Sequence, residues 1–174
     1  MKSSIRSLVA CLGACAALVS TSAQAEGFYA ELGYAWIQIS GGGISATPAD
    51  ALLRVGYNVT PYLGVEVAGG TSASSANVRG ASIKVDSAYG VYLKGQYEVA
   101  PSLELFAKLG WIDSTLKVSG GGFSASTSDN SFSYAVGVQY LFDKNWYVQA
   151  DYASYYDKSG VTGRGPSISG GYRF

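Results

Sequence analysis

Short segments in which apolar side chains alternate with small or polar ones recur along this chain. In the last of them, Ile168, Gly170, Tyr172 and Phe174 would share one face of an extended strand, while serine, glycine and Arg173 would share the other. Lipid offers no hydrogen bonds, so strands that cross it must pair with each other and close into a barrel. The outer face must then be apolar, and the shielded inner face can hold polar groups. The alternation therefore predicts an all-β fold, an antiparallel up-and-down transmembrane barrel.

The first 25 residues have the features of a secretory signal peptide. Lys2 and Arg6 form a basic start, residues 8–19 form an apolar core, and Ala23 and Ala25 form an A-x-A cleavage site. The apolar core is too short for a spanning helix, which needs about 20 residues. We expect a signal peptide over residues 1–25 and one barrel domain over residues 26–174.

Both cysteines, Cys11 and Cys15, lie inside this signal. The mature chain would then have no disulfide and no thiolate metal site. The stretch 12–15 also resembles a lipoprotein cleavage box, in which Cys15 would carry the lipid. The apolar core continues beyond Cys15 and a good cleavage site follows, so ordinary cleavage after Ala25 is the favoured interpretation.

Composition supports a membrane barrel over a soluble one. Without Lys2 and Arg6, ten basic and twelve acidic residues remain, a balance that argues against binding to nucleic acid. The chain is rich in tyrosine (14) and glycine (23), which suits aromatic girdles and small inward residues. A soluble barrel would place its apolar residues inside. Here the outward faces collect aromatic residues near strand ends, among them Tyr57, Tyr62, Tyr97, Tyr140, Trp146, Tyr172 and Phe174.

The alternation predicts eight strands. Short turns are expected near residues 60, 101 and 144, and longer connections over 40–50, 71–84, 113–131 and 156–165. Short periplasmic turns and long external loops are typical of such barrels, and an even strand count would place both termini on the periplasmic side. The expected strands are 27–39, 51–59, 62–70, 85–99, 103–112, 132–142, 146–155 and 166–174.

Several of these segments resemble those of a known family. The runs 135–140, 145–146 and 150–152 and the ending Tyr172-Arg-Phe174 are similar to the small outer-membrane β-barrels, a porin-family group that includes the transmembrane domain of outer membrane protein A and the X/Ail-type barrels. The resemblance implies a place in the outer membrane of a Gram-negative bacterium, in contact with lipid and lipopolysaccharide. Ile168, Tyr172 and Phe174 match the terminal signal that the barrel-assembly machinery reads in that family. The peptidoglycan-binding domain of protein A-type members is expected to be absent.

Charged residues on the inward face are the best candidates for a functional site. Eight strands leave an interior just wide enough for side chains to fill, so we interpret these charges as a structural salt-bridge network. A gated polar passage is the alternative. A catalytic carboxylate pair is least favoured, because paired charges lower the proton affinity of a carboxylate. By strand phase the inward charges are Glu31, Arg54, Glu66, Lys94, Glu98, Glu104, Lys108, Asp151 and Arg173.

The relative positions of four of these charges can be expected from the strand order. Arg54 and Glu66 flank the turn at residues 60–61 and fall at similar depth on neighbouring strands. Glu31 and Arg173 would lie on the two strands that close the barrel.

The chain contains no histidine. A Ser-His nucleophile pair is therefore impossible, and so is the usual metal site. An aspartate–lysine or two-carboxylate site stays formally possible, but no motif marks one. We predict no enzymatic activity, no cofactor and no metal.

A short repeat stands in two of the expected loops. Ser40–Ala46 matches Ser119–Ala125 at six of seven positions, each copy containing three glycines in a row. A phosphate-binding loop would need a following helix, and none is predicted. Flexible linker chemistry is the favoured interpretation, and a surface recognition element is the alternative. The loop charges, Asp50 among them, are mixed in sign and form no basic cluster.

The sequence thus favours a non-enzymatic outer-membrane barrel that supports envelope integrity or surface interaction. A narrow channel for small solutes or ions, gated by the inward charges, is the first alternative. An adhesin that acts through loops 71–84 and 113–131 is the second.

Overall fold

The computed structural model describes residues 27–42, 44–74, 76–78, 81–120, 123–158 and 160–174. The predicted signal peptide, with Ala23 and Ala25, lies outside these ranges, so its cleavage stays a prediction. Among the described residues, no helix has both the length and the apolar character to cross a membrane.

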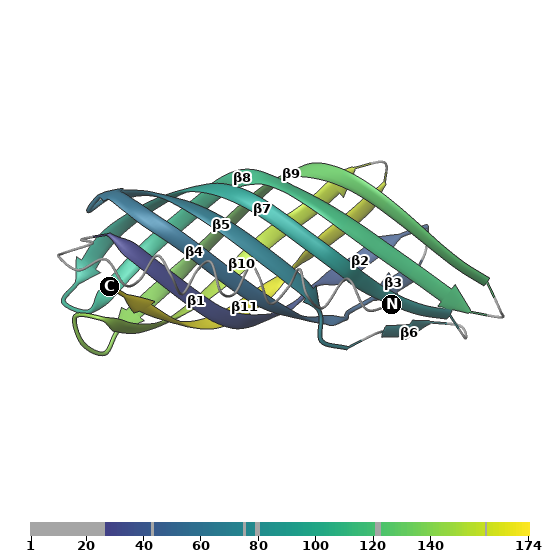
Figure 1. Cartoon of the computed structure of the whole chain (residues 1–174), viewed down its shortest axis with the longest axis horizontal. Coiled ribbons are helices and arrows are strands. Elements are labelled where there is room, and N and C mark those ends of the chain that lie inside the picture. Colours follow the sequence, from purple (N-terminus) through teal and green to yellow (C-terminus); the bar gives the residue numbers. More distant parts are fainter. Residues whose placement is uncertain (1–26, 43, 75, 79–80, 121–122, 159) are drawn as a thin grey trace, which may run out of the picture.

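The described residues form a closed antiparallel barrel of eight strands, as the alternation predicted (Figure 1). Each long strand pairs with its sequence neighbour, and β1 pairs with β11 to close the cylinder, with Glu31 opposite Gly171. Three short segments extend long strands: β2 follows β1, β3 precedes β4 and β6 follows β5. The elements are β1 (Phe28–Trp36), β2 (Gln38–Gly41), β3 (Ile44–Ala46), β4 (Ala49–Thr60), β5 (Leu63–Ser72), β6 (Ala76–Val78), β7 (Ala81–Ala100), β8 (Leu103–Gly120), β9 (Phe123–Leu141), β10 (Trp146–Lys158) and β11 (Val161–Arg173).

The outer surface carries an apolar band between two aromatic girdles. The girdle at the short-turn end is held by ring contacts, such as Tyr62 with Tyr97 at 6.3 Å and Trp146 with Tyr172 at 4.9 Å between centroids. On the far side, Trp111 and Phe132 meet edge to face at 5.4 Å. From Leu103 to Trp111 is about nine residues, the length that a tilted strand needs to cross a bilayer.

Above Trp111 and Phe132 the outward residues change from apolar to polar. Asp113 and Asn130, which face each other across β8 and β9, are both exposed. The strands nevertheless continue for nine more residue pairs, to Gly120 opposite Phe123. At about 3.3 Å per residue, this part of the hairpin measures roughly 30 Å along its strands.

The expected long loops are therefore largely wrong. Most of 113–131 is a continuous hairpin, and β10 and β11 run on to Lys158 opposite Val161. The prediction ended each strand where its apolar residues stopped. Lipid contact stops there, but backbone pairing does not, and serine- and threonine-rich segments continue the ladder.

The two copies of the repeat are two hairpin tips with the same register. Ser40 faces Ser45 in β2 and β3, and Ser119 faces Ser124 in β8 and β9. In the first copy, Gly42 has φ +58°, the left-handed conformation that a two-residue hairpin turn requires. The flexible-linker interpretation is wrong for the described residues of this repeat: its flanks are paired strands.

Candidate functional site: the polar network inside the barrel

The lumen is filled by side chains that alternate with the lipid-facing ones. Lys94, Gln139 and Gln149 are almost completely buried, although all three are polar. Apart from Asp50, the buried acidic and basic side chains are equal in number, three of each: Glu31, Glu66 and Asp151 with Arg54, Lys94 and Lys108.

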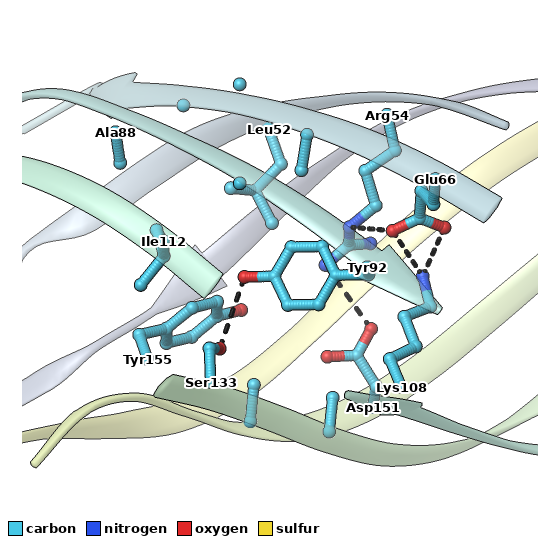
Figure 2. A pocket seen from close by; sticks show the side chains of 16 residues that line it. Leu52, Arg54, Glu66, Ala88, Tyr92, Lys108, Ile112, Ser133, Asp151 and Tyr155 are labelled. Atoms are coloured by element: carbon cyan, nitrogen blue, oxygen red, sulfur yellow. Dashed lines mark hydrogen bonds and ion pairs between the residues drawn. The ribbon is translucent and has the colours of Figure 1, made fainter. Parts of the chain in front are cut away.

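Arg54 on β4 connects three buried carboxylates, of which Figure 2 shows Glu66 and Asp151. Its guanidinium lies 3.4 Å from Glu31 Oε2, 3.8 Å from Glu66 Oε1 and 3.4 Å from Asp151 Oδ2. It also donates to the hydroxyls of Ser167 and Ser169 on β11, at 3.1 and 3.2 Å. Glu31 is the direct cross-strand neighbour of Arg54, whereas Asp151 reaches it from β10 across the lumen.

Glu66 on β5 is held by groups from two other strands. Lys108 Nζ on β8 donates to both of its oxygens, at 2.9 and 2.6 Å, and the Tyr29 hydroxyl donates to Oε2 at 2.9 Å. In the ladder Glu66 faces Gly56, two residues from Arg54. The structure thus places Arg54 and Glu66 at similar depth, and adds Lys108 as the cation nearest to Glu66.

Glu31 on β1 accepts hydrogen bonds from β10. Tyr147 donates to Oε1 and Gln149 to Oε2, both at 2.8 Å. Lys94 Nζ lies 3.9 Å from Oε1 and also donates to Gln139 Oε1 at 3.1 Å. Glu31 therefore keeps several partners besides Arg54.

The lowest layer, near the short turns, is an ion pair across the lumen. Arg173 on β11 donates two bonds to Glu104 on β8, at 3.1 and 2.5 Å. Arg173 lies on a closing strand, as predicted, and its partner is Glu104. Gln139 joins this layer to the one above, since its Nε2 donates to Glu104 at 3.2 Å.

Glu98 departs from the predicted network. Its side chain is exposed at the short-turn end, where a bulge shifts the β7–β8 register between Glu98 and Ala100. It lines an open bowl at the barrel mouth together with Glu104 and Arg173. The prediction assumed an unbroken alternation to the end of the strand.

Sequence reasoning missed a set of inward aromatic rings. Each faces a glycine on the neighbouring strand, where a Cβ atom would overlap the ring. The strand phase contained this signal, because each aromatic residue lies an even number of positions from an inward polar one. The pairs are Tyr29 with Gly56, Tyr92 with Gly110, Phe106 with Gly137 and Tyr147 with Gly171.

Asp50 was also assigned wrongly, as a loop charge. It is buried on the inward face of β4, which begins two residues earlier than predicted. Ser72 donates to its Oδ1 at 2.6 Å, while Oδ2 has no hydrogen-bond partner among the described residues.

The outer half of the lumen is mainly apolar. A cavity of about 40 Å³ adjoins the network, which lines one side of it with Arg54, Glu66, Lys108 and Asp151, while Leu52, Ala88 and Ile112 line the other (Figure 2). A second cavity of about 50 Å³ adjoins Ile112 on the side of β2 and β11. Both are too small for a solute much larger than water.

The residues predicted as an assembly signal lie on the lipid side of the closing strand. Ile168 and Phe174 are exposed, and Tyr172 is half-buried between Trp146 and Phe174. The backbone N–H of Phe174 donates to the carbonyl of Phe28 on β1 at 2.9 Å. Phe174 therefore stands at the seam that closes the barrel.

Above the membrane, a small polar cluster connects β9 to β10. Lys158 and the Tyr156 hydroxyl donate to Asp129, at 2.8 and 2.9 Å. These bonds, that of Lys158 above all, hold the pKa of the Asp129 carboxyl below its usual range, and Asp129 in turn raises the pKa of Lys158. A separate exposed pair joins Arg164 to Asp157 at 2.7 Å. The described residues contain no cluster of histidine, cysteine and carboxylate side chains that could hold a metal ion.

A family model for the outer membrane protein beta-barrel domain matches residues 7–174. The attachment invasion locus protein Ail of Yersinia pestis is 22% identical, the match covering 86% of this chain and 99% of Ail with a TM-score of 0.67. Neisserial surface protein A is 16% identical, covering 87% and 97% with a TM-score of 0.67.

A third similar structure is the N-terminal β-barrel domain of Pseudomonas aeruginosa OprF, at 10% identity, with 84% and 97% covered and a TM-score of 0.62. At these identities the structures show a shared fold. No curated protein matches the chain.

Proposed function

Because this chain belongs to the outer membrane protein β-barrel family of Gram-negative bacteria, we propose that it is a sealed, non-enzymatic barrel that presents external hairpins at the cell surface. The signal peptide would direct export, and the seam at Phe174 would be read by the barrel-assembly machinery. Both termini would face the periplasm, since Tyr29 and Arg173 pair at the short-turn end. The outer surface would contact lipid and lipopolysaccharide.

The observation that carries the proposal is the network that crosses the lumen. Its ion pairs join strands that are not neighbours: β4 with β10, β5 with β8, and β8 with β11. A passage for solutes would require several of these buried pairs to separate together, and separating one buried pair costs about 3–5 kcal/mol. The apolar cavities above the network add a second obstacle, because a narrow apolar constriction excludes water and ions. This arrangement supports a structural interior over a gated passage.

The second observation is the length of the strands outside the membrane. β8 and β9 continue in register for nine residue pairs above Trp111 and Phe132. A barrel that served only as a membrane plug would not need this extension. It supports a role in surface interaction, with the membrane portion as a rigid base.

One similar structure suggests a class of ligand, which the charges of this chain do not favour. Ail of Yersinia pestis has been solved in complex with the heparin analogue sucrose octasulfate. A polysulfated sugar requires a concentration of unpaired basic side chains. Among the described external cations, Lys158 and Arg164 are each paired with an aspartate, and Lys84 stands opposite Lys117 across β7 and β8. The charges of the external segments are mixed in sign, so we propose a partner other than a sulfated polysaccharide.

Conductance in planar bilayers tests the sealed lumen. The refolded protein should be silent, and so should a variant with Arg164→Met, which removes an exposed cation outside the membrane. Steady, discrete openings that change on Arg54→Met would overturn the proposal, because they would show that ions pass through the network. Openings unaffected by Arg54→Met would indicate leakage around the barrel. Measuring the folded fraction of the same sample would identify such leakage.

A further inference from the structure

The rim of the barrel at the short-turn end carries two carboxylates directly opposite each other. Glu98 on β7 faces Glu104 on β8, just before the bulge that shifts their ladder. Like charges in this position repel each other, because opposed side chains start only about 5 Å apart. Arg173 and Gln139 donate to Glu104 at 2.5 to 3.2 Å. Glu98 has no such partner among the described residues, so one negative charge at the rim stays uncompensated.

The bowl at the barrel mouth, which Glu98 and Glu104 line, has a volume of about 600 Å³ and contains further oxygens without a donor. Gln96 is only 8% exposed, and its Nε2 donates to the carbonyl of Pro61 at 3.2 Å. Its Oε1 has no hydrogen-bond partner among the described residues, and neither has the Oδ1 of Asn58 in the same wall. Leaving a buried acceptor unpaired is costly. The bowl therefore combines an unpaired carboxylate with amide oxygens that lack a donor.

An ammonium group fits this set of oxygens. A primary ammonium has three N–H donors, one positive charge and no acceptor. Hydrogen bonds from such a cation to a carboxylate are about twice as strong as those between neutral groups. An anion would be repelled by the two carboxylates, and the guanidinium of Arg173 that could attract it already gives two bonds to Glu104. The bowl therefore favours a ligand with a primary ammonium.

A groove of about 730 Å³ adjoins the bowl on the lipid-facing wall, and Tyr62 and Tyr97 line both. Small side chains form its floor, because Gly95 faces Ala107 across β7 and β8. The next outward pair toward the rim is bulkier, Tyr97 opposite Leu105, and both of these side chains are exposed. The bilayer core holds no water to fill such a hollow. An acyl chain fits its apolar lining and its place in the membrane.

We propose that the bowl and the groove together bind one aminophospholipid, with its primary ammonium against Glu98 and an acyl chain over Gly95 and Ala107. The phosphate of such a lipid lies between these two parts, where Tyr62 and Tyr97 carry hydroxyl donors. The lipid belongs to the periplasmic leaflet, an assignment that rests on the proposed function, in which the short-turn end faces the periplasm. Lipid contact elsewhere on the wall requires no particular headgroup, whereas this site does.

Native mass spectrometry of the folded protein in detergent micelles, titrated with phospholipids that share the same acyl chains, tests the headgroup. Phosphatidylethanolamine has a primary ammonium, phosphatidylcholine keeps the positive charge without an N–H, and phosphatidylglycerol has no cation. We expect one phosphatidylethanolamine per chain, bound at least tenfold more tightly than either of the others. Equal affinity for the three lipids, or tighter binding of phosphatidylglycerol, would overturn the proposal.

Two other occupants are outcomes of the same experiment. Glycerophosphoethanolamine carries the headgroup without acyl chains, and it should bind at least tenfold more weakly than the lipid. Equal affinity would assign the bowl to a soluble amine and would contradict the role of the groove. A lipid-free dimer as the main species would assign the groove to a second copy of the chain and would also overturn the proposal.

Protein variants locate each part of the lipid. Glu98→Gln should weaken phosphatidylethanolamine binding at least tenfold, to the affinity of phosphatidylcholine, whereas Asp113→Asn removes an exposed carboxylate beyond the outer girdle and should have no effect. Ala107→Leu fills the floor of the groove and should weaken the binding of both lipids at least tenfold. Ala30→Leu is its matched control, because it makes the same change on the lipid-facing side of β1. A preference for phosphatidylethanolamine that survives Glu98→Gln, or equal effects of the two leucine variants, would contradict the site.

The outcomes separate the lipid site from the proposed function. Conductance through the lumen would overturn the sealed barrel and leave the lipid preference standing. A silent barrel without a headgroup preference would overturn the lipid site and leave the sealed barrel standing.

Discussion

Replacement of Arg54 by methionine is the sharpest test of the interior network. Methionine keeps much of the side-chain volume but removes the charge, so the change acts mainly on electrostatics. Arg54 is 5% exposed and contacts three carboxylates and two serine hydroxyls. Without it, three buried carboxylates would face Lys94 and Lys108 alone. Leaving one buried charge uncompensated costs about 3–5 kcal/mol, which is the loss of unfolding free energy that we expect.

The three carboxylates would keep different numbers of partners after this substitution. A second substitution, at the carboxylate with the fewest partners, can therefore restore part of the lost stability. Glu31 retains Tyr147 and Gln149, and Glu66 retains Lys108. Asp151 retains the Ser167 hydroxyl at 2.8 Å, and its Oδ1 has no partner among the described residues even in the intact network. Adding Asp151→Asn to Arg54→Met restores the balance of charge. The double variant should recover about half of the lost stability, roughly 2 kcal/mol.

Denaturant unfolding in detergent micelles, followed by the heat-sensitive mobility shift of folded barrels, measures both changes. Arg164→Met is the control, because it breaks an exposed ion pair and should cost less than about 1 kcal/mol. The account of a charge-balanced network is wrong if the unfolding free energy of the Arg54→Met variant lies within about 1 kcal/mol of that of the unaltered protein. It is also wrong if adding Asp151→Asn lowers the unfolding free energy further.

Three further predictions concern packing, assembly and pH. Gly56→Ala should destabilise the barrel by about 1–3 kcal/mol in the same unfolding assay, because its Cβ would overlap a tyrosine ring, while Gly170→Ala meets no atom within 4 Å and should be tolerated. Deletion of Phe174 should block assembly, and normal surface levels of the truncated chain would contradict the seam's role. The Asp129 carboxyl has a lowered pKa, so its bridge to β10 is complete above about pH 4 and is lost as pH falls through that lowered value. Lys158→Met should raise this pKa toward about 3.9, as the carboxyl carbon shift in a pH titration will report.

The barrel could be predicted because each spanning strand has two chemically different faces. Alternation determines which residues face lipid. The even number of strands and the short turns determine the order of the strands around the barrel. Strand length outside the membrane could not be predicted in the same way. Above Trp111 the outward positions of β8 become polar, as at Asp113 and Lys117, and the remaining apolar residues fall in the opposite phase, so the lipid-facing pattern that marks a spanning strand ends while its backbone pairing continues.

The network was predictable in its members more than in its contacts. Strand phase places Arg54, Lys94 and Lys108 on the inward face, where the structure buries them. It does not tell which carboxylate each one meets, because those partners lie across the lumen. Contacts such as that of Arg173 with Glu104, three strands apart in the barrel, depend on strand tilt and stagger. Neither quantity can be obtained from the alternation of one strand.

The interior network meets the outer end of the β9–β10 ladder at one residue. Ser154 forms the last pair of that ladder with Tyr134, and its buried carbonyl would be costly to leave without a hydrogen bond. Ser133 Oγ donates to it at 2.9 Å and itself lies 3.2 Å from the Tyr92 hydroxyl. A side chain of the lumen thus supplies a hydrogen bond at the point where the backbone ladder stops. Because this carbonyl is satisfied, the β9–β10 ladder can end at this level without leaving a buried acceptor unpaired.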